Sequence, residues 1–202
     1  MRRDTRPDAG QAFPIYIMMV AGLLFLALAF FAVGKASALR NEAQGAADAS
    51  ALAAGQSARE QFEAPFIEAL WTDSLGVFLG RSPLIGGCAA AQSLASDNDA
   101  TLTSCEPSEG GFRDSITTRV EGTDAVASSV LPGSGDTHAT REATAIVEFR
   151  CEWTSVDLNE DGVQDVYFFT CDNGKMAEIR PSSPPLWSSV SKILFDVHLV
   201  DR

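Results

Sequence analysis

The sequence has no charged residue between Ala12 and Gly34. This absence excludes an ordinary water-exposed helix there, because such a helix carries charged side chains on its outer face. A helix over residues 12–34 would be about 34 Å long, against about 30 Å for the hydrocarbon core of a bilayer. The segment therefore predicts a single transmembrane helix. The alternative is a signal peptide cleaved after the small residues Ala36, Ser37 and Ala38.

Groups that commonly perform catalysis are scarce. There are two histidines: His138 falls in a Gly- and Ser-rich segment over residues 131–141, interpreted as a long loop, and His198 alternates with apolar residues. No G-x-S-x-G, H-E-x-x-H or phosphate-binding glycine loop occurs. We therefore expect no enzymatic activity, no catalytic residues and no organic cofactor.

Basic residues are also few, 15 against 27 acidic ones, which gives a net charge of −12. Such a chain should repel nucleic acid and anionic lipid headgroups. Three of the arginines, Arg2, Arg3 and Arg6, precede the apolar segment. Basic flanks stay in the cytoplasm, so the tail over residues 1–11 is predicted to be cytoplasmic and the rest of the chain to lie outside.

The sequence holds only four cysteines, Cys88, Cys105, Cys151 and Cys171. In an exported domain, four cysteines usually form two disulfides, although three connectivities are possible and four reduced, buried thiols are the alternative. Cys151 and Cys171 lie at equal distances along the chain from Asp161. A hairpin centred on Asp161 would bring them together and would leave Cys88 to pair with Cys105.

The remaining pattern predicts an α+β fold with an antiparallel sheet. Good helix formers without proline follow the apolar segment, so a helical extension is expected over residues 35–64. Apolar spacing predicts helices over 66–80 and 88–97, and period-two patterns predict strands over 100–105, 113–121, 143–154, 165–171 and 192–200. Residues 65–202 should form one head domain beyond the membrane.

Small residues recur along the predicted helix. Gly22, Ala29 and Ala32 lie within the apolar segment, and Ala46 and Ala47 lie in the extension. Small side chains let helices approach closely in lipid, so these residues are candidates for packing against copies of the chain or related subunits. The alternative is a plain anchor that packs with nothing.

One acidic loop has the spacing of a calcium site. Its ligand candidates are the side chains of Asp157, Asn159, Asp161 and Asp165 and the carbonyl of Val163, with Gly162 at the turn. The glutamate that closes an EF-hand is absent, since that position is Phe168. The loop is more similar to the calcium loops of FG-GAP or VCBS-type extracellular repeats. A polar hairpin turn is the simpler alternative.

A family resemblance emerges from the order of these features. Gly10-Gln11, the apolar span and the run from Gln44 through Asp48 to Ala54 resemble the N-terminal region of TadE/TadG-like proteins, over about residues 8–56. Those proteins are membrane-anchored components associated with assembly of tight-adherence (Flp-type) pili. The resemblance implies a pilin-like head and partners among pilus or secretion subunits. Prepilin processing is not expected, because Ile15 stands where processing sites carry an acidic residue.

Two functions follow as hypotheses. The first is a structural or accessory subunit of a tight-adherence pilus or related secretion apparatus. The second is a membrane-tethered extracellular domain, unrelated to pili, that binds a ligand in a calcium-dependent way through the acidic hairpin and the 131–141 loop.

Overall fold

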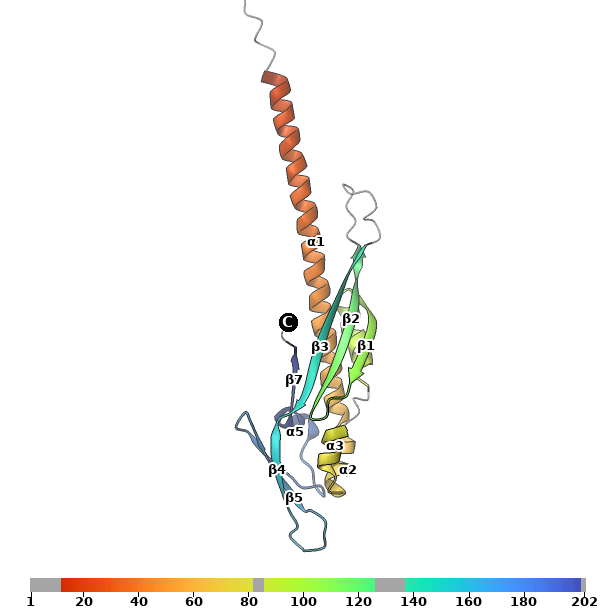
Figure 1. Ribbon diagram of the computed structural model, residues 1–202, viewed down its shortest axis with the longest axis vertical. Helices are drawn as coiled ribbons and strands as arrows, with labels where there is room; N and C mark the ends of the chain where they lie inside the picture. The colour runs from red at the N-terminus through yellow and green to blue at the C-terminus, as the bar shows by residue number, and fades with distance from the viewer. Residues whose placement is uncertain (1–11, 82–85, 126–136, 201–202) are drawn as a thin grey trace, which may run out of the picture.

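The computed structural model describes residues 12–81, 86–125 and 137–200, and in it the chain forms one long helix with a mixed head packed along its C-terminal half (Figure 1). The helices are α1 Ala12–Gln61, α2 Glu63–Trp71, α3 Leu75–Arg81, α4 Cys88–Asp97 and α5 Trp187–Leu194. The strands are β1 Ala100–Ser108, β2 Arg113–Ala125, β3 His138–Phe149, β4 Cys151–Val156, β5 Val166–Cys171, β6 Met176–Ile179 and β7 Phe195–Leu199. The predicted α+β class is confirmed.

The strands form two antiparallel sheets. The larger has the order β1-β2-β3-β7 and lies along α1, and the smaller has the order β4-β5-β6. β3 and β4 are separated by Arg150 alone, so the chain passes directly from one sheet to the other. The smaller sheet and its β4–β5 loop lie at the end of the molecule opposite the N-terminus of α1 (Figure 1).

Alanine makes the contact between α1 and the larger sheet possible. One face of the helix is fully or nearly fully buried, and it consists of Leu39, Ala43, Ala46, Ala47, Ser50, Ala51, Ala54 and Ala58. These positions recur at three- and four-residue spacings, which defines one helix face. Short side chains let the helix axis lie close to the strands. Even the polar groups here are satisfied, since Thr118 on β2 donates to the Ala47 carbonyl at 3.2 Å.

A second, larger core lies between the two sheets and is aromatic. Phe66 on α2 is fully buried, and its ring centroid lies 5.3 Å from Trp187 on α5 and 6.0 Å from Phe169 on β5. Tyr167 is also fully buried, and its hydroxyl donates to the Leu70 carbonyl at 2.7 Å. This core therefore joins the smaller sheet to the helices that follow α1.

Several predicted boundaries were wrong. The strand expected over 143–154 is two strands in different sheets, and the strand expected over 192–200 begins as helix α5. The helix expected over 66–80 is broken between α2 and α3, where Asp73 adopts a positive φ of 49°. β6 was not predicted. The helix over 88–97 was predicted correctly.

The predicted loop over 131–141 also needs correction. Its first part lies outside the described residues, but His138 already belongs to β3, where it pairs with Ala125 of β2. The predicted cytoplasmic tail, residues 1–11, likewise lies outside the described residues. The boundaries proposed for the membrane span, the extension and the head remain predictions.

Candidate functional site

The N-terminal half of α1 is apolar and lies away from the head. Its large side chains are exposed: Phe13, Ile15, Tyr16, Ile17, Met18, Met19, Val20, Leu23, Leu24, Phe25, Leu26, Leu28, Phe30, Phe31 and Val33. Among the described residues, α1 is the one helix long and apolar enough to cross a membrane. An apolar surface of this extent marks a membrane or protein interaction site in any folded chain.

Three of the predicted packing residues lie on this exposed half. Gly22 has open space around it, because a Cβ built there would meet nothing within 4 Å. Ala29 and Ala32 are half-buried. Gly22 and Ala29 are seven residues apart, about two turns, so they share one side of the helix. These positions are available to a second helix.

The other two predicted packing residues are not available. Ala46 and Ala47 were expected to face neighbouring subunits, yet they are 1% and 0% exposed and pack in one cluster with Val120, Ala143 and Ala145 of the chain's own sheet. The buried, alanine-rich side of α1 (the alanine face) packs against the head of the same chain. The interpretation of Ala46 and Ala47 as subunit contacts is therefore corrected.

The acidic loop joins β4 to β5 and is closed by hydrogen bonds to its own backbone. The Asp157 carboxylate accepts N–H groups of Glu160 at 2.7 Å and Gly162 at 2.8 Å. Asp161 accepts the N–H of Val163 at 2.9 Å, and Asp165 that of Leu158 at 2.8 Å. The Gly162 N–H, with neighbouring backbone N–H groups, holds the pKa of Asp157 below its usual value.

This loop offers oxygen ligands of the kind calcium prefers, on side chains from Asp157, Asn159, Asp161 and Asp165 and on the carbonyl of Val163. Its carboxylates are instead occupied by backbone N–H groups. Within the ranges that the structure describes, no three His, Cys, Asp or Glu side chains gather as they would around a metal ion. The calcium interpretation stays a prediction.

The strands beside this loop have the predicted register. Cys151 lies opposite Cys171 and Trp153 opposite Phe169. The disulfides join Cys151 to Cys171 and Cys88 to Cys105. The first links β4 to β5, and the second ties the N-terminus of α4 to β1. Both pairings are those that the hairpin argument predicted.

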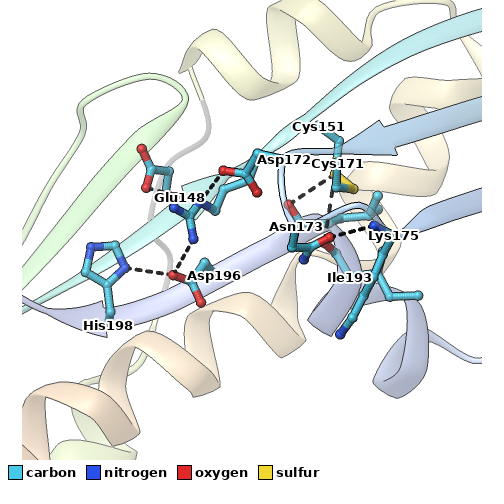
Figure 2. A network of polar contacts seen from close by, with 11 residues as sticks. Glu148, Cys151, Cys171, Asp172, Asn173, Lys175, Ile193, Asp196 and His198 are labelled. Carbon is cyan, nitrogen blue, oxygen red and sulfur yellow. Dashed lines mark hydrogen bonds and ion pairs between the residues drawn. A yellow bond between two sulfur atoms is a disulfide. The ribbon is translucent and has the colours of Figure 1, made fainter.

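A polar cluster that the sequence did not reveal surrounds the passage between the sheets (Figure 2). The Arg150 guanidinium forms ion pairs with Asp172 at 2.9 Å and Asp196 at 3.0 Å. Its backbone N–H donates to the Leu194 carbonyl at 3.0 Å, and its carbonyl accepts the N–H of Asp172 at 3.1 Å. Arg150 thus connects β3, β7 and the β5–β6 turn. Its partners are distant in sequence, so no local spacing could have identified them.

Both histidines occupy structural positions in strands. His138 Nδ1 lies 2.9 Å from the carbonyl oxygen of Gly122, and His198 Nδ1 lies 3.1 Å from Asp196 Oδ2 (Figure 2). Each contact lies within the larger sheet or at its edge. Neither histidine contacts a serine or cysteine nucleophile in these interactions.

Comparison with known proteins identifies one similarity. The sequence model of the Flp pilus-assembly TadE/G-like family (Tad) matches residues 10–57. The match confirms the resemblance found in the sequence and supports a role associated with Flp pili. It covers most of α1, including the exposed apolar half and all of the alanine face except Ala58. No curated protein and no solved structure matches the chain.

Proposed function

We propose that this chain is a structural or accessory subunit of a tight-adherence (Flp) pilus or a related secretion apparatus. One observation carries the proposal: the segment similar to the pilus-assembly family coincides with a helix that is exposed and apolar at one end and built into a folded head at the other. A subunit of a membrane-based assembly needs both an anchor and a domain held at a fixed distance from it.

In this proposal residues 12–34 span the membrane. The span is long enough for the hydrocarbon core, and it contains no charge whose burial in lipid would cost free energy. The arginines before it favour a cytoplasmic N-terminus. The two disulfides support a head outside the cytoplasm, because disulfides persist in oxidising compartments.

Small residues of the span supply a means of assembly. Gly22 and Ala29 lie on one side of the span, where the close approach of another helix is stabilised by van der Waals packing and not by hydrophobic burial. The partner is a second copy of this chain or a related pilus or secretion subunit.

We also retain calcium binding by the β4–β5 loop as a proposal. The spacing of Asp157, Asn159, Asp161, Val163 and Asp165 supports it. Binding would require the carboxylates to exchange some N–H contacts for the ion. The role of the ion would be to stabilise the hairpin.

The second candidate function is a membrane-tethered binding domain without a pilus role. It is favoured by the position of the β4–β5 loop, which lies at the end of the head farthest from the N-terminus of α1 (Figure 1). A loop so placed is presented to molecules outside the cell if the helix is anchored as proposed.

Cysteine crosslinking in membranes tests the subunit proposal. Gly22→Cys in the full-length chain should give crosslinked species, either with itself or with another membrane protein, under mild oxidation. Leu24→Cys is the matched control, because it lies at nearly the same depth but about 160° round the helix.

Deletion of the gene should also abolish filament assembly or secretion. Unchanged assembly together with equal crosslinking of the two variants would reject the proposal.

A further inference from the structure

The turn between β1 and β2, residues 109–112, closes over a buried carboxyl group. Asp114, the second residue of β2, is 3% exposed, and its Oδ1 accepts the N–H of Gly110 at 2.8 Å. The side chain lies on the core face of β2, because the buried residues of this strand alternate from Asp114 through Ile116 to Val120. Asp114 carries the one carboxyl group that is buried among the described residues.

No positive charge compensates this carboxyl group. It forms no ion pair with a described residue, and its hydrogen-bond donor is the N–H of Gly110. Glu109, in the turn itself, adds a second negative charge close by. A carboxylate in a buried site without a cation is unfavourable relative to the neutral acid. Ionisation of Asp114 therefore favours any conformation that admits water to the carboxyl group.

The charged side chains on the neighbouring strands lie on the other face of the sheet. Arg113 precedes Asp114, Glu148 on β3 is opposite Arg113, and Asp196 on β7 is opposite Glu148. Directly opposed residues share a face of a sheet, and successive residues of a strand alternate between faces. These three side chains therefore point away from the face that carries Asp114.

The ends of the neighbouring helices supply no cation to this carboxyl group either. Arg59, at the end of α1, pairs with Glu60 at 3.1 Å. Arg81, at the end of α3, is exposed and forms no ion pair with a described residue. The environment of Asp114 thus consists of apolar surroundings, one backbone N–H and a neighbouring carboxylate.

This environment moves the ionisation of Asp114 toward neutral pH. Burial raises its pKa from 3.8 to about 6, the N–H of Gly110 opposes the rise, and Glu109 adds to it. A conformation in which the carboxyl group is hydrated has a pKa near the ordinary value and so binds the proton less tightly. As pH rises through about 6, linkage therefore shifts the population toward the hydrated conformation.

The turn is the movable part of the structure around Asp114. Gly110 and Phe112 are exposed, and Gly111 has a positive φ of 73°. The carbonyl of Phe112 accepts the N–H of Phe149 at 2.9 Å. Gly111 lies against α3, since a Cβ built there would be 3.6 Å from the Gly80 carbonyl oxygen. Two adjacent glycines gain more conformational freedom on opening than other residues would, which favours the open turn.

We propose that the β1–β2 turn is a pH-dependent conformational switch. It is closed against α3 while the Asp114 carboxyl group is protonated, and it opens when that group ionises and is hydrated. Opening breaks the hydrogen bond between Phe112 and Phe149 and exposes the Phe149 ring, which belongs to the aromatic core between the sheets. The switch depends on the folded head alone and does not rest on the proposed role in pili.

Hydrogen exchange at the backbone N–H of Phe149 in the full-length protein in detergent tests the switch. After correction for the intrinsic effect of pH on exchange, the ratio of open to closed turn should rise about tenfold from pH 5 to pH 8. Linkage gives this factor for a pKa of about 6 in the closed turn and 3.8 in the open one. Low concentrations of denaturant should not change this exchange, because opening of a turn exposes little surface. A ratio that is the same at both pH values, or exchange that follows global unfolding in denaturant, would overturn the proposal.

Two variants separate the switch from a general effect of pH. In Asp114→Asn the side chain cannot ionise, so the corrected exchange at Phe149 should be equal at pH 5 and pH 8. Glu109→Gln removes an exposed charge, and the turn should then open at a lower pH than in the wild type.

Asp124→Asn is the matched control for Glu109→Gln, because Asp124 is an exposed carboxylate at the opposite end of β2. It should leave the pH of opening unchanged. The proposal is wrong if Asp114→Asn keeps the tenfold change, or if Glu109→Gln opens at the same pH as the wild type.

Discussion

Gly55 on α1 lies directly against Val197 on β7, close enough that a Cβ on Gly55 would be 2.8 Å from Val197 Cγ1. Val147 Cγ2 and Ala145 Cβ would follow at 3.4 and 3.5 Å. We expect Gly55→Ala to lower the free energy of unfolding of the full-length protein in detergent by about 1–3 kcal/mol, because the added methyl overpacks the contact between helix and sheet. Chemical denaturation measures this change.

Gly45→Ala is the matched control on the same helix. Its Cβ meets no atom within 4 Å, so the helix should gain up to about 1 kcal/mol from the better helix former. Opposite signs for the two substitutions are expected. A loss of stability in both would mean that the close contact at Gly55 does not explain its effect.

Asp114 on β2 predicts a dependence of stability on pH. Burial raises its pKa to about 6, although its carboxylate accepts the N–H of Gly110 at 2.8 Å. The folded state therefore holds this proton at pH values where the unfolded state, with a pKa near 3.8, has lost it. Stability from this group is fully present below about pH 4 and is lost as pH rises through about 6, by about 3 kcal/mol in total.

Asp114→Asn removes the ionisation and keeps an oxygen acceptor for Gly110. Its free energy of unfolding should exceed that of the wild type at pH 8, and the advantage should shrink or vanish at pH 4. Denaturant titrations at the two pH values give the comparison. The same difference between variant and wild type at both pH values would contradict a raised pKa at Asp114.

Arg150 should contribute more to the free energy of unfolding than its partial exposure suggests. Arg150→Met keeps the apolar stem but removes ion pairs to Asp172 and Asp196, which lie on separate parts of the chain. We expect a loss of about 1–2 kcal/mol in unfolding free energy, larger than for an isolated surface pair because several charges form one network. Hydrogen exchange should increase most in β7 and the β5–β6 turn.

Arg119→Met is the control for Arg150. Arg119 pairs with Glu142 at 2.7 Å across neighbouring strands, with both side chains exposed. That substitution should cost under about 0.5 kcal/mol. If the two substitutions cost the same, the Arg150 cluster has no special role in holding the sheets together.

Calcium binding predicts a shift in melting temperature. If the β4–β5 loop binds calcium with a dissociation constant on the order of 0.1–1 mM, then about 5 mM calcium should add roughly 1–2 kcal/mol of stability relative to excess chelator. Asp161→Ala should abolish the shift. Glu160→Gln, which changes a carboxylate of the same loop outside the proposed ligands, should keep it. Identical responses in wild type and Asp161→Ala would reject the site.

Features governed by local pattern could be predicted from the sequence. The uncharged stretch ending at Gly34 and the absence of proline after it were enough to predict a continuous helix. The symmetric placement of Cys151 and Cys171 around Asp161 was enough for the hairpin register and both disulfides. In each case the contacts join residues that are close in sequence or that lie on either side of one hairpin turn.

Features decided by distant contacts could not be predicted. The β3–β4 segment reads as one strand, but β3 pairs with β7 up to Phe149 and β4 pairs with β5 from Cys151, and these partners are distant in sequence. The pattern assigns residues 192–194, the end of α5, to a strand, because apolar residues suit either structure in so short a segment. The sequence identifies Ala46 and Ala47 as packing residues but not the sheet they pack against, since a small-residue surface packs equally well against a sheet or another helix.

The absence of any break in α1 has a mechanical consequence. The helix runs without interruption from Ala12 to Gln61, and its last turns lie inside the core of the head beside Phe62 and Trp187. Between the N-terminal end of α1 and the head there is no flexible linker that could absorb a force or a rotation applied to that end. Such a force is transmitted along α1 to the core of the head. A change in the tilt of α1 therefore changes the orientation of the head by the same amount.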